Sequence, residues 1–228
     1  MLDKYRHEYK YIITEQQIAE LKNRLNDLMP IDPHVGPTKS YHITSLYFDD
    51  YYNRCYYENL SGTDPREKFR IRIYNKSLSK ISLECKRKEH GKTLKTSCSL
   101  SIDQCEKLMR GEVLPDISNQ PSVLRKLTME MLIHHMRPVV IVGYERIPYI
   151  YRLGNVRVTL DMRLYSSTDV LKFLEGNLAQ RPVMLKGFHL MEVKWDEYIP
   201  DVIYRACQLD NLTQTAYSKY FLCRRYQM

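Results

Sequence analysis

Several segments of the chain alternate strictly between apolar and charged residues. In the clearest case, Phe69, Ile71 and Ile73 alternate with Arg70 and Arg72. The pattern recurs in the segments 6–10, 82–86, 156–164 and 191–195. Because successive side chains of a strand point to opposite faces of a sheet, these segments are predicted to be strands with one apolar and one charged face.

Helical patterns are fewer and shorter. Thr14 and Gln17 have the spacing of a capping box, and an apolar stripe at helical spacing follows them as far as Pro30. The other predicted helices run from Ser101 to Arg110, from Ser122 to Met136, and from Pro200 onward with a break near Asn211.

The predicted fold class is α+β. About eight antiparallel strands closed into a barrel would turn every second residue toward a shared tunnel, with the helices supporting the barrel from outside. We find no internal repeat or long linker, so residues 1–228 are expected to form a single domain. An open sheet that packs on one side and meets solvent on the other would also alternate in this way.

The composition favours an anionic partner. Lys and Arg number 35 and Asp and Glu 27, which gives a net charge of +8 and a pI near 9.1. The chain has only 8 glycines and contains neither GxxxxGK[ST] nor GxGxxG. A bound phosphate group would therefore be held by side chains.

The arrangement of the charges favours phosphate together with a metal ion. Arg70 and Arg72 share one strand face, and so do Arg157 and Arg163. Two like charges about 4 Å apart repel by about 4 kcal/mol at an effective dielectric constant near 20, and a bound anion relieves that repulsion. The charged faces also carry the carboxylates Glu8, Glu84, Asp161 and Glu192. Carboxylates and phosphates together are the usual ligands of Mg²⁺ and Mn²⁺.

The sequence contains no apolar run of about 18 residues and no apolar leader. We therefore expect a cytoplasmic protein that is associated with a membrane, if at all, only through a separate membrane partner. The six cysteines include no CxxC pair and are expected to be reduced and structural.

Short motifs along nearly the whole chain, in this order, carry a family resemblance. They are Arg6-His7-Glu8-Tyr9-Lys10-Tyr11, Ser45-Leu46-Tyr47-Phe48-Asp49, Lys68-Phe69-Arg70-Ile71-Arg72, Leu83-Glu84-Cys85-Lys86, Tyr144-Glu145-Arg146, Val156-Arg157-Val158-Thr159-Leu160-Asp161, Met191-Glu192-Val193-Lys194 and Tyr217-Ser218-Lys219-Tyr220. In these motifs the chain resembles the triphosphate tunnel metalloenzymes (the CYTH-like superfamily). Within that superfamily it resembles the catalytic domain of the vacuolar transporter chaperone (VTC) polyphosphate polymerases.

The resemblance implies a tunnel that binds triphosphate or polyphosphate with Mn²⁺ or Mg²⁺, and it assigns roles by position. The implied catalytic cations are Arg70, Arg72, Lys86, Arg146, Arg157 and Lys219. The implied substrate-binding residues are Lys10, Lys95 and Ser218, to which the charged strand faces add Lys194 and Arg163. Glu192 is the implied principal metal ligand, and Glu8, Glu84 and Asp161 would either assist it or orient neighbouring cations. Ser218 and Lys219 would also suit an ordinary helix surface.

One departure from the superfamily pattern bears on the reaction. Its hydrolases, such as the thiamine triphosphatases and class IV adenylyl cyclases, begin with ExExK, and here Arg6 takes the place of the first glutamate. An added cation suits a longer anionic chain, so the leading hypothesis is transfer of the ATP γ-phosphate to growing polyphosphate.

Three other functions remain open at this stage. One is hydrolysis of tripolyphosphate or an organic triphosphate, and another is polyphosphate binding without turnover. The third is nucleic-acid binding, and the sequence argues against it, because the 19 tyrosines are scattered and form no stacking platform that the sequence identifies.

Overall fold

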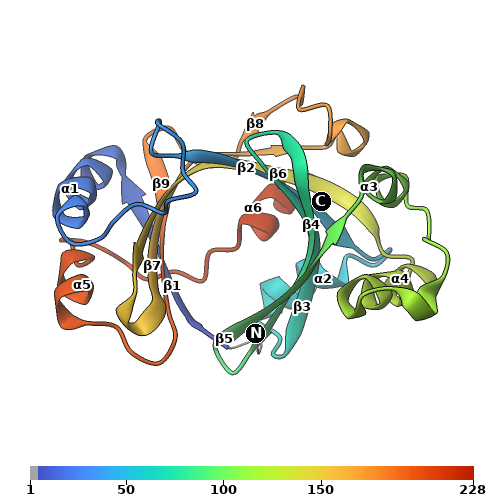
Figure 1. Ribbon diagram of the computed structural model, residues 1–228, viewed down its shortest axis with the longest axis horizontal. Helices are drawn as coiled ribbons and strands as arrows, with labels where there is room; N and C mark the ends of the chain where they lie inside the picture. Colours follow the sequence, from blue (N-terminus) through green and yellow to red (C-terminus); the bar gives the residue numbers. More distant parts are fainter. Residues whose placement is uncertain (1–4) are drawn as a thin grey trace.

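The computed structural model describes residues 5–228, and its strands form one antiparallel sheet. The strands are β1 (His7–Thr14), β2 (Tyr41–Asp49), β3 (Arg66–Tyr74), β4 (Ser77–Glu89), β5 (Lys92–Leu100), β6 (Arg137–Tyr151), β7 (Val156–Ser167), β8 (Arg181–Pro182) and β9 (Phe188–Trp195). Their order across the sheet is β1-β9-β7-β6-β2-β3-β4-β5, and the short β8 pairs with β7. Figure 1 shows that this sheet is strongly curled.

The two edge strands of the curled sheet meet at a single point. The backbone N–H of Arg6 donates to the carbonyl of Thr93, and the N–H of Thr93 donates to the carbonyl of Arg6, both at 3.0 Å. Within residues 5–228 we find no other ladder pairing between β1 and β5. The α+β class and the curled antiparallel sheet are as predicted, whereas a fully closed barrel is not confirmed.

The helices are α1 (Glu15–Asn26), α2 (Arg54–Ser61), α3 (Ile102–Met109), α4 (Ser122–His134), α5 (Asp201–Ala206) and α6 (Lys219–Arg225), with 3-10 turns at Ile117–Asn119, Leu153–Asn155 and Val170–Lys172. Helices α1 and α5 cover one flank of the outer face of the sheet and α3 and α4 cover the other, whereas α6 lies inside the curl (Figure 1). On one flank, Leu21 and Leu25 of α1 pack with Ile13, Val158 and Met191, and all five are buried. Burying such side chains contributes about 1.5–3 kcal/mol each. Because the apolar strand face lies under the helices, the charged face is turned to the inside of the curl.

Three predicted helices are confirmed with small changes of boundary. Thr14 and Gln17 form the predicted capping box at the start of α1, and Ser101 and Gln104 form another at the start of α3. The third, α4, ends at His134 instead of Met136. In the C-terminal region the break is longer than predicted, because residues 207–218 separate α5 from α6.

The sequence patterns missed α2. This helix follows Asn53, which adopts a left-handed conformation with φ 56° and makes no side-chain cap. The buried carboxylate of Asp49 replaces the cap by accepting hydrogen bonds from the N–H groups of Cys55 and Tyr56, at 2.8 and 3.2 Å. The helix start is therefore stabilised by a residue at the end of β2. Asp49 lies six and seven positions before its partners, whereas a capping residue is normally only two or three positions before them, so the capping pattern does not reveal it.

None of the helices in the described part of the chain is long and apolar enough to span a membrane.

Candidate functional site: a cationic cavity

The inside of the curled sheet holds a cavity of about 390 Å³. Among residues 5–228, the lining includes thirteen basic side chains, namely Arg6, Lys10, Arg66, Lys68, Arg70, Arg72, Lys86, Lys88, Lys95, Arg146, Arg157, Lys194 and Lys219. Only two carboxylates of these described residues, Glu8 and Glu192, share the lining. The cavity is therefore strongly cationic, and its charge favours a multiply charged anion.

Side chains of β2, β4 and β6 hold two arginines of β3 in place at the cavity wall. Arg70 contacts the Glu84 carboxylate through Nε at 2.8 Å and Nη2 at 2.6 Å, and it donates from Nη1 to the Tyr47 hydroxyl at 2.8 Å. Arg72 donates to Ser45 Oγ at 3.0 Å and to the Tyr144 hydroxyl at 3.3 Å. Glu84 is 3% exposed and does not line the cavity. Glu84 thus lies next to the cations, as predicted, but it contacts them from behind the cavity wall.

Glu84 is ionised because of these neighbours. Burial alone would raise the pKa of its carboxyl, but the guanidinium groups of Arg70 and Arg72 and the ammonium of Lys95 hold that pKa far below its usual range. A permanently charged carboxylate keeps Arg70 oriented. An arginine has five N–H donors, and the contacts of Arg70 use three, so two remain for a ligand.

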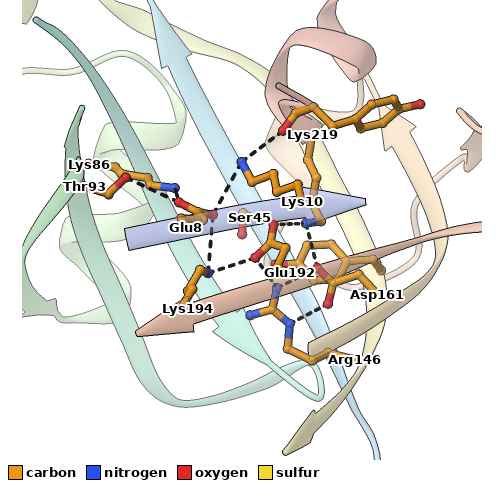
Figure 2. Close-up of polar contacts among 12 residues, drawn as sticks. Glu8, Lys10, Ser45, Lys86, Thr93, Arg146, Asp161, Glu192, Lys194 and Lys219 are labelled. Carbon is orange, nitrogen blue, oxygen red and sulfur yellow. Dashed lines mark hydrogen bonds and ion pairs between the residues drawn. The ribbon is translucent and has the colours of Figure 1, made fainter. Parts of the chain in front are cut away.

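A second buried carboxylate supports Arg146 and Lys219. Asp161 accepts from Arg146 Nε and Nη2, both at 2.6 Å, and lies 2.6 Å from Lys219 Nζ (Figure 2). Its side chain is 0% exposed and does not line the cavity. Glu192 also contacts three cations: Arg146 at 3.3 Å, Lys219 of α6 at 2.5 Å and Lys194 at 2.8 Å. Asp161, like Glu84, thus orients cations from behind the wall.

Glu8 and Glu192 are the carboxylates that face the cavity. They come from neighbouring strands, because Glu8 pairs with Lys194 and Lys10 pairs with Glu192 across β1 and β9. Burial would raise the pKa of both carboxyls, but the surrounding ammonium groups hold each pKa well below its usual range. For Glu8 those groups are Lys10, Lys86 and Lys194 (Figure 2).

The structure brings most of the predicted residues to one cavity. Arg157 and Lys95 line it with side chains 42% and 52% exposed, and each has a carboxylate partner, Asp32 at 3.3 Å and Glu84 at 3.1 Å. Ser218 lines the cavity and also caps α6 by accepting from the N–H of Phe221. Ser218 and Lys219 therefore line the cavity and do not form the ordinary helix surface that was the alternative.

Arg163 is the exception among the predicted cations. Its side chain is 82% exposed, pairs with Glu145 at 2.8 Å and does not line the cavity. The register of β6 and β7 shifts between Gly143 and Glu145, and Arg163 has φ 52° in the left-handed region. This bulge breaks the two-residue period. The prediction from alternation is therefore wrong at Arg163.

Four lining cations were not predicted as site residues: Arg6, Arg66, Lys68 and Lys88. Arg66 and Lys68 extend the even-numbered series of Arg70 and Arg72 along β3. Lys88 extends the series of Lys86 along β4. Continuing the two-residue period to the strand ends would have found these three.

The metal implied by the resemblance has two potential ligands here. In residues 5–228, no group of three or more His, Cys, Asp or Glu side chains could hold a metal by itself. Glu8 Oε1, however, is buried and accepts no hydrogen bond from the described residues. It lies 3.4 Å from Lys10 Nζ and 3.6 Å from Lys194 Nζ. Magnesium is commonly held by one or two carboxylates that are completed by substrate phosphates and water. Glu8 and Glu192 fit that role, whereas Glu84 and Asp161 lie behind the cavity wall.

The fold is shared with two candidate adenylyl cyclases, one of which has a dominant triphosphatase activity. A candidate adenylyl cyclase from Hippeastrum with a dominant triphosphatase activity is 12% identical, and its structure superposes with a TM-score of 0.57 over 98% of this chain and 96% of that one. A candidate adenylate cyclase from Bacillus halodurans is 13% identical, with a TM-score of 0.53 over 90% of this chain and 87% of that one. No curated protein matches the sequence.

The likeness to these two structures shows that the curled antiparallel fold is shared. The VTC domain family model matches residues 5–226, and the chain belongs to the VTC domain family.

Proposed function

We propose that the protein is a polyphosphate polymerase that transfers the γ-phosphoryl group of ATP to the end of a polyphosphate chain in the tunnel. The observation that carries the proposal is the lining of thirteen cations and two carboxylates, a charge that suits a chain of many phosphates. The family membership and the position of Arg6 support it further. We place the reaction in the cytoplasm, with ATP, polyphosphate and Mn²⁺ or Mg²⁺ as partners. The proposal allows for a separate membrane protein through which the enzyme associates with a membrane.

The proposed reaction needs no nucleophilic side chain. An oxygen of the chain's terminal phosphate attacks the γ-phosphorus of ATP, the bond from that phosphorus to the β-phosphate oxygen breaks, and ADP leaves. Enzymes accelerate such transfers mainly by alignment and by stabilising charge on the phosphoryl oxygens. A divalent ion held by Glu8 and Glu192 would neutralise part of the phosphate charge.

The arginines provide the alignment in this proposal. Arg70 and Arg146 are each fixed by a buried carboxylate, so little side-chain entropy is lost when phosphate binds. Arg146 uses Nε and Nη2 in its contacts with Asp161 and Glu192, which leaves Nη1 without a hydrogen-bond partner in the described chain. We assign these free donors, together with those of Arg72, to the reacting phosphates.

Hydrolysis of triphosphate is the second candidate, and it is favoured by the similarity to the Hippeastrum protein. The distinction rests on Arg6. Its Nε lies 2.9 Å from Asp196, and the side chain lines the cavity where the hydrolase pattern has a glutamate. A cation here extends the phosphate-binding surface and removes one potential metal ligand.

A time course with ATP and Mn²⁺ tests the proposal. A polymerase releases ADP without an equal amount of orthophosphate, because the γ-phosphate enters the polymer. Release of orthophosphate in step with ADP, or from tripolyphosphate alone, would assign the hydrolase function instead. Binding of polyphosphate without either product would assign the non-catalytic function.

A further inference from the structure

Three cations at one end of the cavity differ from all the others in their partners. Arg66, Lys68 and Lys88, here called the outer cation cluster, lie where β3 begins and β4 ends, and Arg66 pairs with Lys88 across these strands. Within residues 5–228, none of the three forms an ion pair with a carboxylate within 4.0 Å. The ten other lining cations each have such a partner.

The contacts of the outer cation cluster are to neutral groups. Arg66 Nη1 donates to the carbonyl of Thr63 at 2.6 Å. Lys68 Nζ donates to Asn59 Oδ1 at 2.6 Å and to Ser218 Oγ at 3.3 Å. Neutral oxygens orient these cations without cancelling their charge.

The cluster therefore carries uncompensated repulsion. Burial and the charges of Arg66, Lys86 and Lys10 lower the pKa of Lys68 to about 7, although Cys55 acts in the opposite direction. Burial, Arg66 and Lys10 also lower the pKa of Lys88, with Glu8 and Asp64 opposing them. Like charges on neighbouring strands destabilise a sheet, and a bound anion removes this cost.

The outer end of the cluster is also distant from the innermost arginine of β3. Arg66 and Arg72 are six positions apart on β3, which corresponds to about 20 Å along the backbone at the usual strand rise of 3.3 Å per residue. Three linked phosphates are much shorter than this backbone separation, so a ligand that lies along the whole row is a longer chain.

We infer that the outer cation cluster is a separate subsite for phosphates of a long polyphosphate chain, distal to the reacting phosphates, and that it determines chain-length specificity. This inference rests on the proposed function, since it takes the same tunnel and the same class of ligand. Lys68, which contacts Ser218 of the α6 cap, links the cluster to the inner residues, while Arg66 and Lys88 lie furthest out.

The test compares two ligands on one variant. The double variant Arg66→Gln/Lys88→Met removes two charges from the cluster and spares the contacts of Lys68. Its matched control, Lys107→Met/Arg110→Gln, removes the same charges from α3 and its C-terminal end, outside the cavity. Calorimetry at fixed salt measures the Kd for long-chain polyphosphate and for tripolyphosphate.

The affinity for the long chain is expected to fall at least about tenfold more than that for tripolyphosphate in the double variant. The control should shift both affinities by the same small factor. Equal losses for the two ligands would overturn the inference, because the cluster would then act on any phosphate in the tunnel. Unchanged binding of the long chain would overturn it too. The single variant Lys88→Met guards against a folding defect, because the native Lys88 side chain makes no hydrogen bond to the described residues that the change could remove.

These outcomes are separate from those of the proposed function. If the wild type binds long chains through the cluster but makes no polyphosphate, the subsite stands and the polymerase proposal fails. If it makes polyphosphate while the double variant binds long chains as the wild type does, only the subsite fails.

Discussion

Arg146 and Asp161 form a two-pronged ion pair, with Nε to Oδ1 and Nη2 to Oδ2 both at 2.6 Å, between directly opposed positions of β6 and β7. Arg146 lines the cavity, whereas Asp161 is buried behind it. The carboxylate therefore fixes a phosphate-binding guanidinium, a role that Glu84 has for Arg70. The four carboxylates predicted on the charged strand faces thus divide into two that face the cavity, Glu8 and Glu192, and two that support its arginines, Glu84 and Asp161.

This division predicts the effect of Asp161→Asn. The change leaves the buried charges of Arg146 and Lys219 with one carboxylate fewer, so the free energy of unfolding should fall by about 3 kcal/mol. The Asp103→Asn change removes an exposed partner of Lys107 on α3 and should cost less than about 1 kcal/mol. Urea denaturation measures both. Equal small effects would show that the Arg146–Asp161 pair is not a supporting element.

The positions of Arg72 and Arg163 predict opposite results for two similar substitutions. Arg72→Ala should lower kcat/KM for triphosphate turnover about a hundredfold or more, because its guanidinium lines the cavity. Arg163→Ala should leave kcat/KM unchanged, since this side chain is 82% exposed and lies outside the cavity. Steady-state kinetics on both variants checks this. A strong loss in Arg163→Ala would contradict the placement of the β6–β7 bulge outside the site.

Glu8 and Glu192 should be the residues that determine the affinity for the divalent metal ion. The Glu192→Gln change removes a carboxylate charge at the cavity and should raise the Mn²⁺ concentration needed for half-maximal binding in the presence of tripolyphosphate by about tenfold or more. Asp161→Asn should leave that concentration nearly unchanged. Titration of free Mn²⁺ by electron paramagnetic resonance gives the value without relying on turnover. The reverse ranking would assign the metal to the buried carboxylate.

Proton uptake should accompany phosphate binding near neutral pH. Burial lowers the pKa of both Lys68 and Lys86 to about 7, with help from Lys10 in both cases, whereas Glu8 raises that of Lys86. A bound anion favours the charged forms, so phosphate affinity should rise as the pH falls through 7. The folding stability of the free protein should depend on pH in the opposite direction. Unfolded lysines hold their protons up to about pH 10, whereas folded Lys68 and Lys86 lose theirs near pH 7, so the free energy of unfolding should rise with pH above 7.

Calorimetry in two buffers of different ionisation enthalpy measures this uptake. Lys68→Met should reduce the number of protons bound with tripolyphosphate relative to the wild type, and the titration of the ligand itself cancels in the comparison. The same uptake in both proteins would show that Lys68 is already charged in the free protein.

Strand periodicity was sufficient to predict much of the site. The alternation along β3 correctly placed Arg70 and Arg72 on the inner face, because the apolar residues between them must lie under the outer helices. It failed at Arg163, because a bulge depends on the pairing of two strands and leaves no mark in one of them.

Other features depend on contacts between distant segments. The start of α2 is capped by Asp49, and Lys219 enters the site only because α6 packs inside the curl, where Tyr220 donates a hydrogen bond to the same Asp49. The sequence could assign a carboxylate to the charged face, but not decide whether it faces the cavity, like Glu192, or supports an arginine, like Asp161.

The most direct measurement is a gel of the products formed from γ-labelled ATP and Mn²⁺, run for the wild type and for Arg72→Ala. The account predicts a ladder of labelled polyphosphate with the wild type and almost none with the variant. Label found only as orthophosphate, or a ladder of equal intensity from both proteins, would contradict it.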